Sequence, residues 1–416
     1  MNKRNFMKSA LVAPFLGTAF SDLMAQTQSK PTNKLVDNEA FWQKIRNDYR
    51  LKPDYINLEN GYYCMLPQTI LEEHIKQVRE MNYQASFYMR TWQFDDKAAV
   101  RQRLSKLVGC GQEELILTRN TTESLDTVIS GIDWKAGDEV VMAHQDYGSM
   151  KDMFLQQAQR YGVVCRTVSV PNHPKNDAEI VELYAKVITP KTRLLMLCHV
   201  INITGQILPV RQICDMAHAK GVEVMVDGAH AVAHIPVNIS ELNCDYYGSS
   251  LHKWLCSPLG AGILYVHKSK IEKLWPAFAD NSFAKDDIRK LNHTGTHPCS
   301  TDLSVNVALD YYETLGAARK ESRLRYLQNY WTSQVRNLPN VVVNTPADPT
   351  RSCAIANVGI ATLTPAVLAK TLLEKYKIYT VAIDYANVQG VRVTPGLFTT
   401  VEELEQLVRA IKELAG

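Results

Sequence analysis

The chain has 416 residues, of which 46% are hydrophobic and 21% charged, with a formal net charge of +3. This composition is that of an ordinary soluble globular protein, and the length allows two or three average domains or one large domain with a smaller partner. The charge is near neutral and no basic block interleaved with aromatic residues is present, so nucleic acid is not expected as a partner.

The first element expected along the chain is an export signal in residues 1–30. A basic start is followed by a short apolar stretch at 10–20 and a plausible cleavage point after Ala25. The stretch is too short and interrupted to be a stable membrane span. The run from Lys3 to Lys8 resembles a twin-arginine signal in which lysine replaces one arginine. We expect the protein to fold in the cytoplasm and to be exported to the periplasm; an uncleaved anchor or a chance basic start are the alternatives.

The nine cysteines form neither a C-x-x-C pair nor a metal-finger spacing, and several lie in apolar runs. An odd, scattered set of this kind indicates reduced, buried thiols rather than a disulfide framework. This pattern agrees with folding in the cytoplasm before export.

Short apolar, β-branched runs alternate with helical patterns between residues 110 and 270. Strands that are apolar on both faces and separated by helices predict an α/β fold with a mostly parallel sheet covered on both sides. The expected strands are 115–117, 139–142, 163–170, 194–200, 222–226 and 263–266, and the expected helices are 122–131, 149–161, 178–188 and 210–220.

The pattern changes after residue 300. Long helices are expected at 303–315 and 319–338, followed by short strands near 341–344, 354–360 and 391–394 and a final helix at 401–415. We therefore divide the mature chain into a large domain, residues 31–300 with an N-terminal arm, and a smaller α+β C-terminal domain, residues 301–416.

The densest chemical signal lies between residues 222 and 254. One apolar strand delivers Asp227 at its carboxyl end, and a second short strand at 245–250 delivers Lys253. Ligand-binding residues of such sheets follow the carboxyl ends of strands. Pyridoxal 5′-phosphate (PLP) needs this pair, because its aldehyde requires a lysine amine and its protonated ring nitrogen requires a carboxylate. A helix cap and a solvated surface lysine are the alternative interpretation.

Two motifs give this pair a family context. Val-Asp-Gly-Ala-His at 226–230 and Ser-x-His-Lys-Trp at 250–254 resemble the fold-type I, PLP-dependent enzymes of aminotransferase class V, in a branch similar to isopenicillin N epimerase and related to cysteine desulfurases and kynureninases. The resemblance runs from about Tyr49 to the C-terminus. It implies that Lys253 carries the cofactor as a Schiff base, that Asp227 keeps the ring nitrogen protonated, and that an amino-acid substrate reacts through an external aldimine.

The resemblance also implies further cofactor contacts. Tyr147 is expected over the ring, and Asn202 and His230 near the phenolic oxygen of the cofactor. Helix N-termini and hydroxyls bind phosphate well, and the phosphate contacts implied are Thr121, Thr122, Ser250 and His252. Without the resemblance, residues 119–123 read as a capping box, with Asn120 capping and Glu123 reaching back.

Two further positions concern the partner and the substrate. Gly295-Thr296 resembles the segment that reaches the neighbouring subunit's phosphate, which implies a homodimer. Arg392 resembles the arginine that grips the substrate carboxylate, a role suited to its planar fork; alone it could equally form a surface salt bridge.

Transamination, epimerisation or racemisation, and elimination remain open, because all share their first step. A cysteine desulfurase is disfavoured, since no cysteine lies between residues 376 and 390 and Cys353 reads as a core thiol. The pairs His230/His234 and His293/His297 have helical metal-ligand spacing, but each is soon followed by proline and lacks the glutamate of H-E-x-x-H. A non-catalytic exported binding protein on the same fold is the last alternative, and it predicts loss of the lysine, the aspartate or the arginine.

Overall fold

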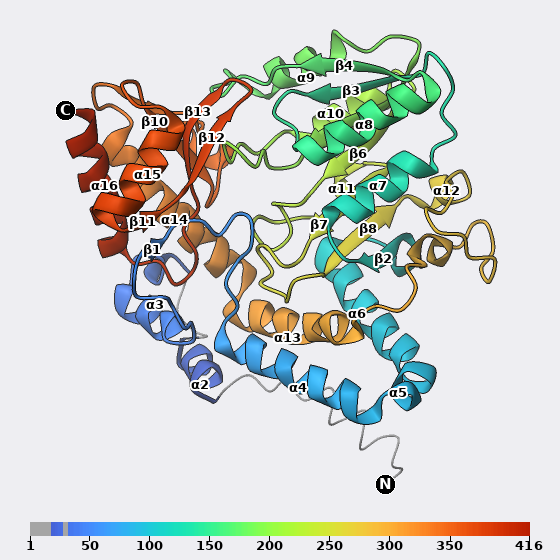
Figure 1. Ribbon diagram of the computed structural model, residues 1–416, viewed down its shortest axis with the longest axis horizontal. Helices are drawn as coiled ribbons and strands as arrows, with labels where there is room; N and C mark the ends of the chain where they lie inside the picture. Colours follow the sequence, from blue (N-terminus) through green and yellow to red (C-terminus); the bar gives the residue numbers. More distant parts are fainter. Residues whose placement is uncertain (1–17, 28–31) are drawn as a thin grey trace.

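The computed structural model describes residues 18–27 and 32–416, and its centre is a seven-stranded sheet (Figure 1). The strand order is β2-β8-β7-β6-β5-β3-β4. Strand β8 is antiparallel to both neighbours and the other neighbouring pairs are parallel, which confirms the mostly parallel α/β sheet. The strands are β2 (Leu115–Thr118), β3 (Glu139–Ala143), β4 (Val164–Val168), β5 (Thr192–Cys198), β6 (Glu223–Asp227), β7 (Tyr246–Ser250) and β8 (Gly262–Val266).

Helices cover both faces of this sheet except at the edge strand β4, where Val164 is exposed. Leu194 and Met196 of β5 belong to one hydrophobic cluster, whereas Leu195 and Leu197 belong to another. This alternation follows from the opposite orientation of successive strand side chains. The first cluster includes side chains of α7 (Thr121–Gly131) and α8 (Gly148–Tyr161), and the second includes side chains of α9 (Asp177–Ala185) and α10 (Val210–His218). Short helices α11 (Ile239–Leu242) and α12 (Lys268–Ile271) complete this region.

A second, antiparallel sheet lies in the C-terminal part, with strand order β12-β13-β10-β9. Three helices, α14, α15 and α16, pack against it, and their residues Trp331, Leu368 and Leu404 are buried in the shared core. The last helix begins at a capping box in which Thr400 and Glu403 bond reciprocally. The elements are β9 (Val341–Val343), β10 (Ala356–Ile360), β12 (Val381–Tyr385), β13 (Val388–Val393), α14 (Ala317–Val335), α15 (Pro365–Tyr376) and α16 (Val401–Ala415).

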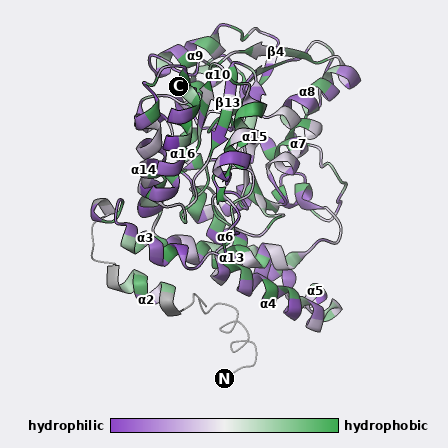
Figure 2. Ribbon diagram, turned by 60° about the vertical axis from the view of Figure 1, so that its left-hand side comes forward, coloured by the Kyte–Doolittle hydropathy of each residue, from purple (hydrophilic) through white to green (hydrophobic). Residues whose placement is uncertain are grey.

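The N-terminal arm runs beneath both sheets and joins them. Strand β1 (Ile56–Asn57) pairs in parallel with β11 (Ile378–Tyr379) of the C-terminal part. Helix α4 (Gln68–Gln84) packs along α13 (Cys299–Leu315), as Figures 1 and 2 both show. The other elements of the arm are α2 (Thr18–Thr27), α3 (Glu39–Arg46), α5 (Ser86–Thr91) and α6 (Gln93–Val108), and the 3₁₀ turns of the chain are η1 (Thr32–Lys34), η2 (Gln112–Glu114), η3 (Ile288–Asn292) and η4 (Pro349–Arg351).

The expected export signal, residues 1–30, lies mostly outside the described residues. Its described portion is helix α2, in which the ring of Phe20 stacks on Tyr311 with centroids 4.1 Å apart. Among residues 18–27 and 32–416, no helix has both the length and the apolar content that crossing a membrane requires.

Gly205 is the point where the loop after β5 contacts the C-terminal part most tightly. Its φ is +77°, and a Cβ there would lie 2.0 Å from the backbone oxygen of Ile355. Gly221 has a similar φ of +74° but no atom within 4 Å of its Cβ position. Gly221 therefore shares the left-handed backbone conformation of Gly205, but a Cβ at Gly221 would meet no neighbouring atom.

We expect Gly205→Ala to lower the free energy of unfolding by roughly 2–4 kcal/mol, because it combines left-handed strain with a backbone clash. Gly221→Ala should cost only about 1 kcal/mol, since strain alone remains. The urea midpoint of each variant at one protein concentration measures the difference. Equal midpoints for the two variants would show that the contact with Ile355 does not stabilise the fold.

Candidate active site

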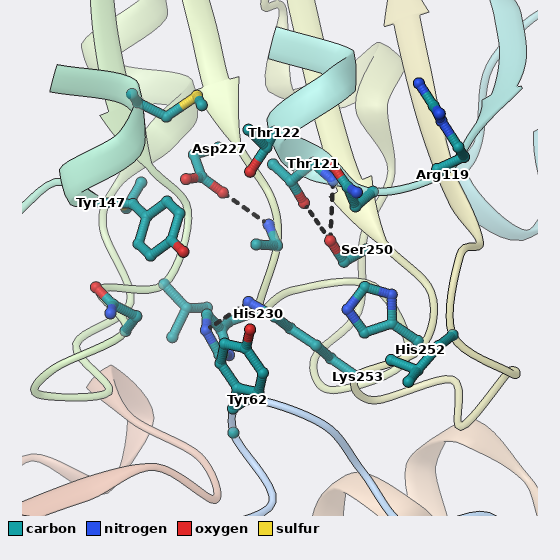
Figure 3. Close-up of a pocket in the computed structure, with 18 of the residues that line it drawn as sticks. Tyr62, Arg119, Thr121, Thr122, Tyr147, Asp227, His230, Ser250, His252 and Lys253 are labelled. Atoms are coloured by element: carbon teal, nitrogen blue, oxygen red, sulfur yellow. Dashed lines mark hydrogen bonds between the residues drawn. The ribbon is translucent and has the colours of Figure 1, made fainter. Parts of the chain in front are cut away.

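The carboxyl ends of β6 and β7 bring the two central residues of the site together. These strands are parallel neighbours, and Asp227 at the end of β6 pairs in register with Gly248 of β7. Lys253 follows β7 by three residues, so both side chains reach one cavity (Figure 3), which has about 1040 Å³ of empty space including its open mouth. Ten of the residues expected from the sequence line this cavity, namely Thr121, Thr122, Tyr147, Asn202, Asp227, His230, Ser250, His252, Lys253 and Arg392.

Thr296 is placed elsewhere. It is exposed and lines a separate hollow with Phe94, Arg101 and His293, on the outer side of α6. Thr296 is therefore not among the residues that line the cavity of its own chain.

The surroundings of the Lys253 amine favour its neutral form more than water does. Burial lowers its pKa to about 8, opposed by the Asp227 carboxylate and helped by the Arg392 guanidinium. Its Nζ lies 3.0 Å from Nε2 of His230. Compared with an ordinary lysine, an amine with a pKa of about 8 has a much larger fraction with a free lone pair near neutral pH, and this is the form that attacks a carbonyl carbon.

The protonation of His230 supports the same conclusion. Nε1 of Trp254 can only donate, and it lies 3.2 Å from Nδ1 of His230, so Nδ1 accepts. Burial, followed by the Lys253 charge, holds the pKa of His230 well below its ordinary value, so the ring is neutral and its proton sits on Nε2. Nε2–H then donates to the lone pair of Lys253 Nζ.

Asp227 is a buried carboxylate with part of its bonding capacity left over. Its Oδ1 accepts the backbone N–H of Ala229 at 2.9 Å. Burial raises the pKa of Asp227, while the Ala229 N–H and the Lys253 charge oppose that rise. A carboxylate in this setting is stabilised in its charged form by a cation placed against it, and a protonated pyridine nitrogen is such a cation.

Another end of the cavity collects hydroxyls and a helix N-terminus. Ser250 Oγ accepts the Thr121 N–H at 2.9 Å and lies 2.7 Å from Thr121 Oγ1. The helix is capped by Asn120, but Glu123 accepts from the backbone N–H of Arg119 and not of Asn120, so the expected capping box is only half formed. The positive end of α7 therefore faces the cavity with hydroxyls around it, as anion binding requires.

His252 lies beside these hydroxyls with an unused ring nitrogen. Its Nδ1 is buried and has no hydrogen-bond partner among the described residues. Burial lowers the pKa of His252 to about 4, so the ring is neutral. An orphaned polar atom at this place fits the phosphate oxygens of PLP, just as the amine and the carboxylate fit its aldehyde and its ring nitrogen. The cavity thus contains groups whose chemistry fits the aldehyde, the ring nitrogen and the phosphate of PLP.

The rest of the cavity wall contains Arg392, which the sequence predicted, and two residues of the N-terminal arm, which it did not. Arg392 enters from β13 and donates to the backbone oxygen of Asn202 at 3.2 Å. Tyr62, which is 74% exposed, and Gly61 reach the cavity from the N-terminal arm. No local motif marks these two positions, since the arm reaches the cavity only through its pairing with the C-terminal part.

Two thiols, Cys198 and Cys353, are not arranged as nucleophiles. Cys198 lines the cavity, but burial and the Asp146 carboxylate hold the pKa of its thiol well above the ordinary value. Cys353 is fully buried, and burial raises its pKa to about 12. A cysteine that attacks sulfur must ionise readily, so neither thiol suits that role.

The histidine pairs with metal-ligand spacing have other partners. His234 stacks on Trp254 at 3.9 Å, and its ring nitrogens bond the backbone of His230 and Ala354. Within residues 18–27 and 32–416, no group of three or more His, Cys, Asp or Glu side chains is arranged to hold a metal ion.

Comparison with known proteins agrees with this geometry. The chain is 28% identical over 406 residues to isopenicillin N epimerase of Streptomyces clavuligerus, covering 91% of this chain and 99% of the relative. It is 26% identical over 346 residues to a cysteine desulfurase of Escherichia coli, covering 76% and 82% of the two chains.

Solved structures share the fold. A structure of the C-DES protein with glycine covalently linked to its PLP cofactor superposes with a TM-score of 0.80 at 23% identity, covering 88% of this chain and 99% of the other. The cysteine desulfurase of Thermococcus onnurineus gives 0.79 at 20% identity, covering 90% and 98%. The sequence profile described as Aminotransferase class-V matches residues 60–409. The chain therefore belongs to the aminotransferase class-V family, with the fold-type I architecture and the PLP cofactor that its two motifs predicted.

Proposed function

We propose that this PLP-dependent enzyme removes the α-proton of an amino acid, after which the same carbon gains a solvent-derived proton on its opposite face, as in an epimerase or racemase. The observation that carries the proposal is one cavity holding a lysine amine of lowered pKa, a buried carboxylate and an arginine. An amine with a pKa of about 8 is about half neutral at pH 8, and the neutral form can accept a proton from carbon. The arginine provides a bidentate partner for the substrate carboxylate.

In this scheme each wall of the cavity has one task. PLP, when bound, supplies a ring that withdraws electrons from the α-carbon. Lys253 binds the cofactor covalently and, once displaced by the substrate amine, takes the α-proton on Nζ. Asp227 would hold the charge of the ring nitrogen, and Tyr147 would pack against the ring. The other roles are phosphate binding by Thr121, Thr122, Ser250 and His252, and contacts with the phenolic oxygen by Asn202 and His230.

The outcome of the reaction is proposed from two considerations. One relative that the chain matches over 99% of its length is an epimerase, isopenicillin N epimerase of Streptomyces clavuligerus. A desulfurase mechanism would need a readily ionised cysteine, and among the described residues that line the cavity the one cysteine is Cys198, whose pKa is raised. Transamination and elimination of a sulfur leaving group need no such cysteine and are the competing outcomes. Incubation with L- and D-amino acids in D₂O separates them, because epimerisation gives deuterated enantiomer, transamination a keto acid, and elimination a released fragment.

We also propose that the enzyme is a homodimer in which Thr296 reaches the partner's cofactor phosphate. Arg119 and Thr122 line both the cavity and the adjoining hollow that contains Phe278 and Thr294, so this exposed face lies at the cavity mouth. Large aromatic side chains are exposed there and on the neighbouring helices, as at an interface, and they are Tyr83, Phe87, Phe94, Trp275 and Phe278. A monomeric mass by light scattering would exclude the arrangement.

Export to the periplasm remains our proposal for the location, supported by the basic and apolar N-terminus and by the nine free thiols, which suit folding before export. The intact mass of the protein recovered from the periplasm tests whether a segment ending near Ala25 has been removed.

Lys253→Ala should abolish borohydride-trapped cofactor at this site and reduce α-proton exchange by at least about 10⁴-fold, because both the covalent bond and the base are lost. Peptide mapping and exchange of the α-proton in D₂O measure the two effects. The exposed Lys220 offers a control, and Lys220→Ala should match the wild type. Undiminished exchange in Lys253→Ala would exclude Lys253 as the base.

Uptake of PLP by the cofactor-free protein should depend on pH. The protonated amine cannot attack an aldehyde, so the rate should rise with pH and level off above about 8, the lowered pKa of Lys253. Since the Asp227 charge raises this pKa, Asp227→Asn should move the midpoint to lower pH. Stopped-flow absorbance gives the profile. A midpoint near 10.5, the ordinary lysine value, would contradict the assignment.

A further inference from the structure

Arg392 is held by a buried carboxylate that the family resemblance did not predict. Glu59 Oε2 accepts from Arg392 Nε at 3.0 Å, and Glu59 Oε1 accepts from Nη2 at 2.6 Å. Both side chains are almost fully buried, with 7% and 4% exposure for arginine and glutamate. The geometry is a bidentate fork, which fixes orientation as well as distance.

The donors that Glu59 leaves unused decide what this pair can do. A guanidinium has five N–H donors. Glu59 takes one from Nε and one from Nη2, and the backbone oxygen of Asn202 takes one from Nη1. One N–H therefore remains on each of Nη1 and Nη2. Arg392 lines the cavity whereas Glu59 does not, so Glu59 binds the arginine from behind and does not occupy the place of a ligand.

The same carboxylate also orders the N-terminal arm at the cavity. Glu59 Oε1 accepts the backbone N–H of Tyr62 at 2.9 Å, and Tyr62 lines the cavity. A Cβ on Gly61 would lie 3.3 Å from Arg392 Cζ and 3.3 Å from Glu59 Oε1, so the arm packs directly on the ion pair. One side chain thus fixes two parts of the cavity wall that come from opposite ends of the chain.

We infer that Glu59 is the positioning residue that aims the free Nη1 and Nη2 donors of Arg392 at the substrate carboxylate. The inference rests on the proposed function, in which Arg392 binds that group. Glu59 also neutralises the arginine, so recognition depends on geometry and not on excess positive charge. When Glu59 holds the guanidinium in place, the site can distinguish a ligand that has a carboxylate from the same ligand without one. Without Glu59 this discrimination should be lost.

The test compares L-alanine with L-alaninamide, which lacks the carboxylate charge, as ligands of the holoenzyme. The change in cofactor absorbance on titration gives a Kd for each, and the ratio of the two values isolates recognition of the carboxylate. Glu59→Gln keeps the size of the side chain and removes its charge. The matched control is Glu403→Gln, because Glu403 forms a bidentate pair with Arg46 at 2.8 and 2.9 Å away from the cavity.

We expect Glu59→Gln to raise the Kd of L-alanine on the order of 10- to 100-fold, as misplacing a binding group does, and to leave that of L-alaninamide within about twofold. Glu403→Gln should change neither value. Glu59→Asp, which keeps the charge on a shorter side chain, should give an intermediate ratio. If Glu59→Gln fails to fold with bound cofactor, Glu59→Asp is used to compare the Kd values of the two ligands instead.

Three results would overturn the inference. Equal weakening of both ligands would indicate a general structural role, an unchanged L-alanine Kd would indicate no role, and tighter binding of L-alanine would show that Glu59 competes with substrate. Arg392→Lys keeps the charge and removes the fork. This variant tests the role of Arg392 in binding the carboxylate separately from the role of Glu59 in positioning Arg392. If that variant binds L-alanine normally, the proposed carboxylate site itself is wrong; if it binds weakly while Glu59→Gln does not, only the inference fails.

Discussion

The site depends on keeping an amine and a carboxylate close together in a buried cavity. The amine must still be able to lose its proton, and the carboxylate must still be able to carry its charge. Burial favours the uncharged form of both Lys253 and Asp227, while their mutual attraction favours the charged forms. The balance leaves the lysine pKa near 8. The parallel register of β6 and β7 maintains this balance, because it places both residues at one edge of a sheet that is buried on both faces.

The central sheet was predictable because its strands are apolar on both faces and bounded by polar turns. Predicted strand 222–226, for example, is β6 shifted by one residue. The N-terminal helices were not predicted. Helix α4 buries only Ile70 and Gln77, and α5 buries only Tyr88, so neither sequence carries the apolar stripe by which a helix is recognised. The prediction that helices cover the sheet on both sides is wrong for β4. This strand lies at the edge of the sheet, and its Val164 is exposed.

The predictable part of the site is the part encoded by contiguous residues. Asp227, His230, Ser250, His252 and Lys253 lie in two short motifs at strand ends, and all of them line the cavity. Tyr62 and Glu59 carry no such signal, since a tyrosine and a glutamate in an arm have many ordinary explanations. Their importance appears only when the arm is paired with β13, through the bridge between Glu59 and Thr394. Tertiary pairing over such a separation cannot be read from local pattern.

The fork between Glu59 and Arg392 joins residues 333 positions apart. During translation at about 5–20 residues per second, a ribosome needs roughly 20–70 seconds to extend the chain from one to the other. Throughout that interval the arm has no partner for its carboxylate, and the nascent protein has no complete cavity. A complete cavity, and with it activity, can therefore form only after the last strand has emerged.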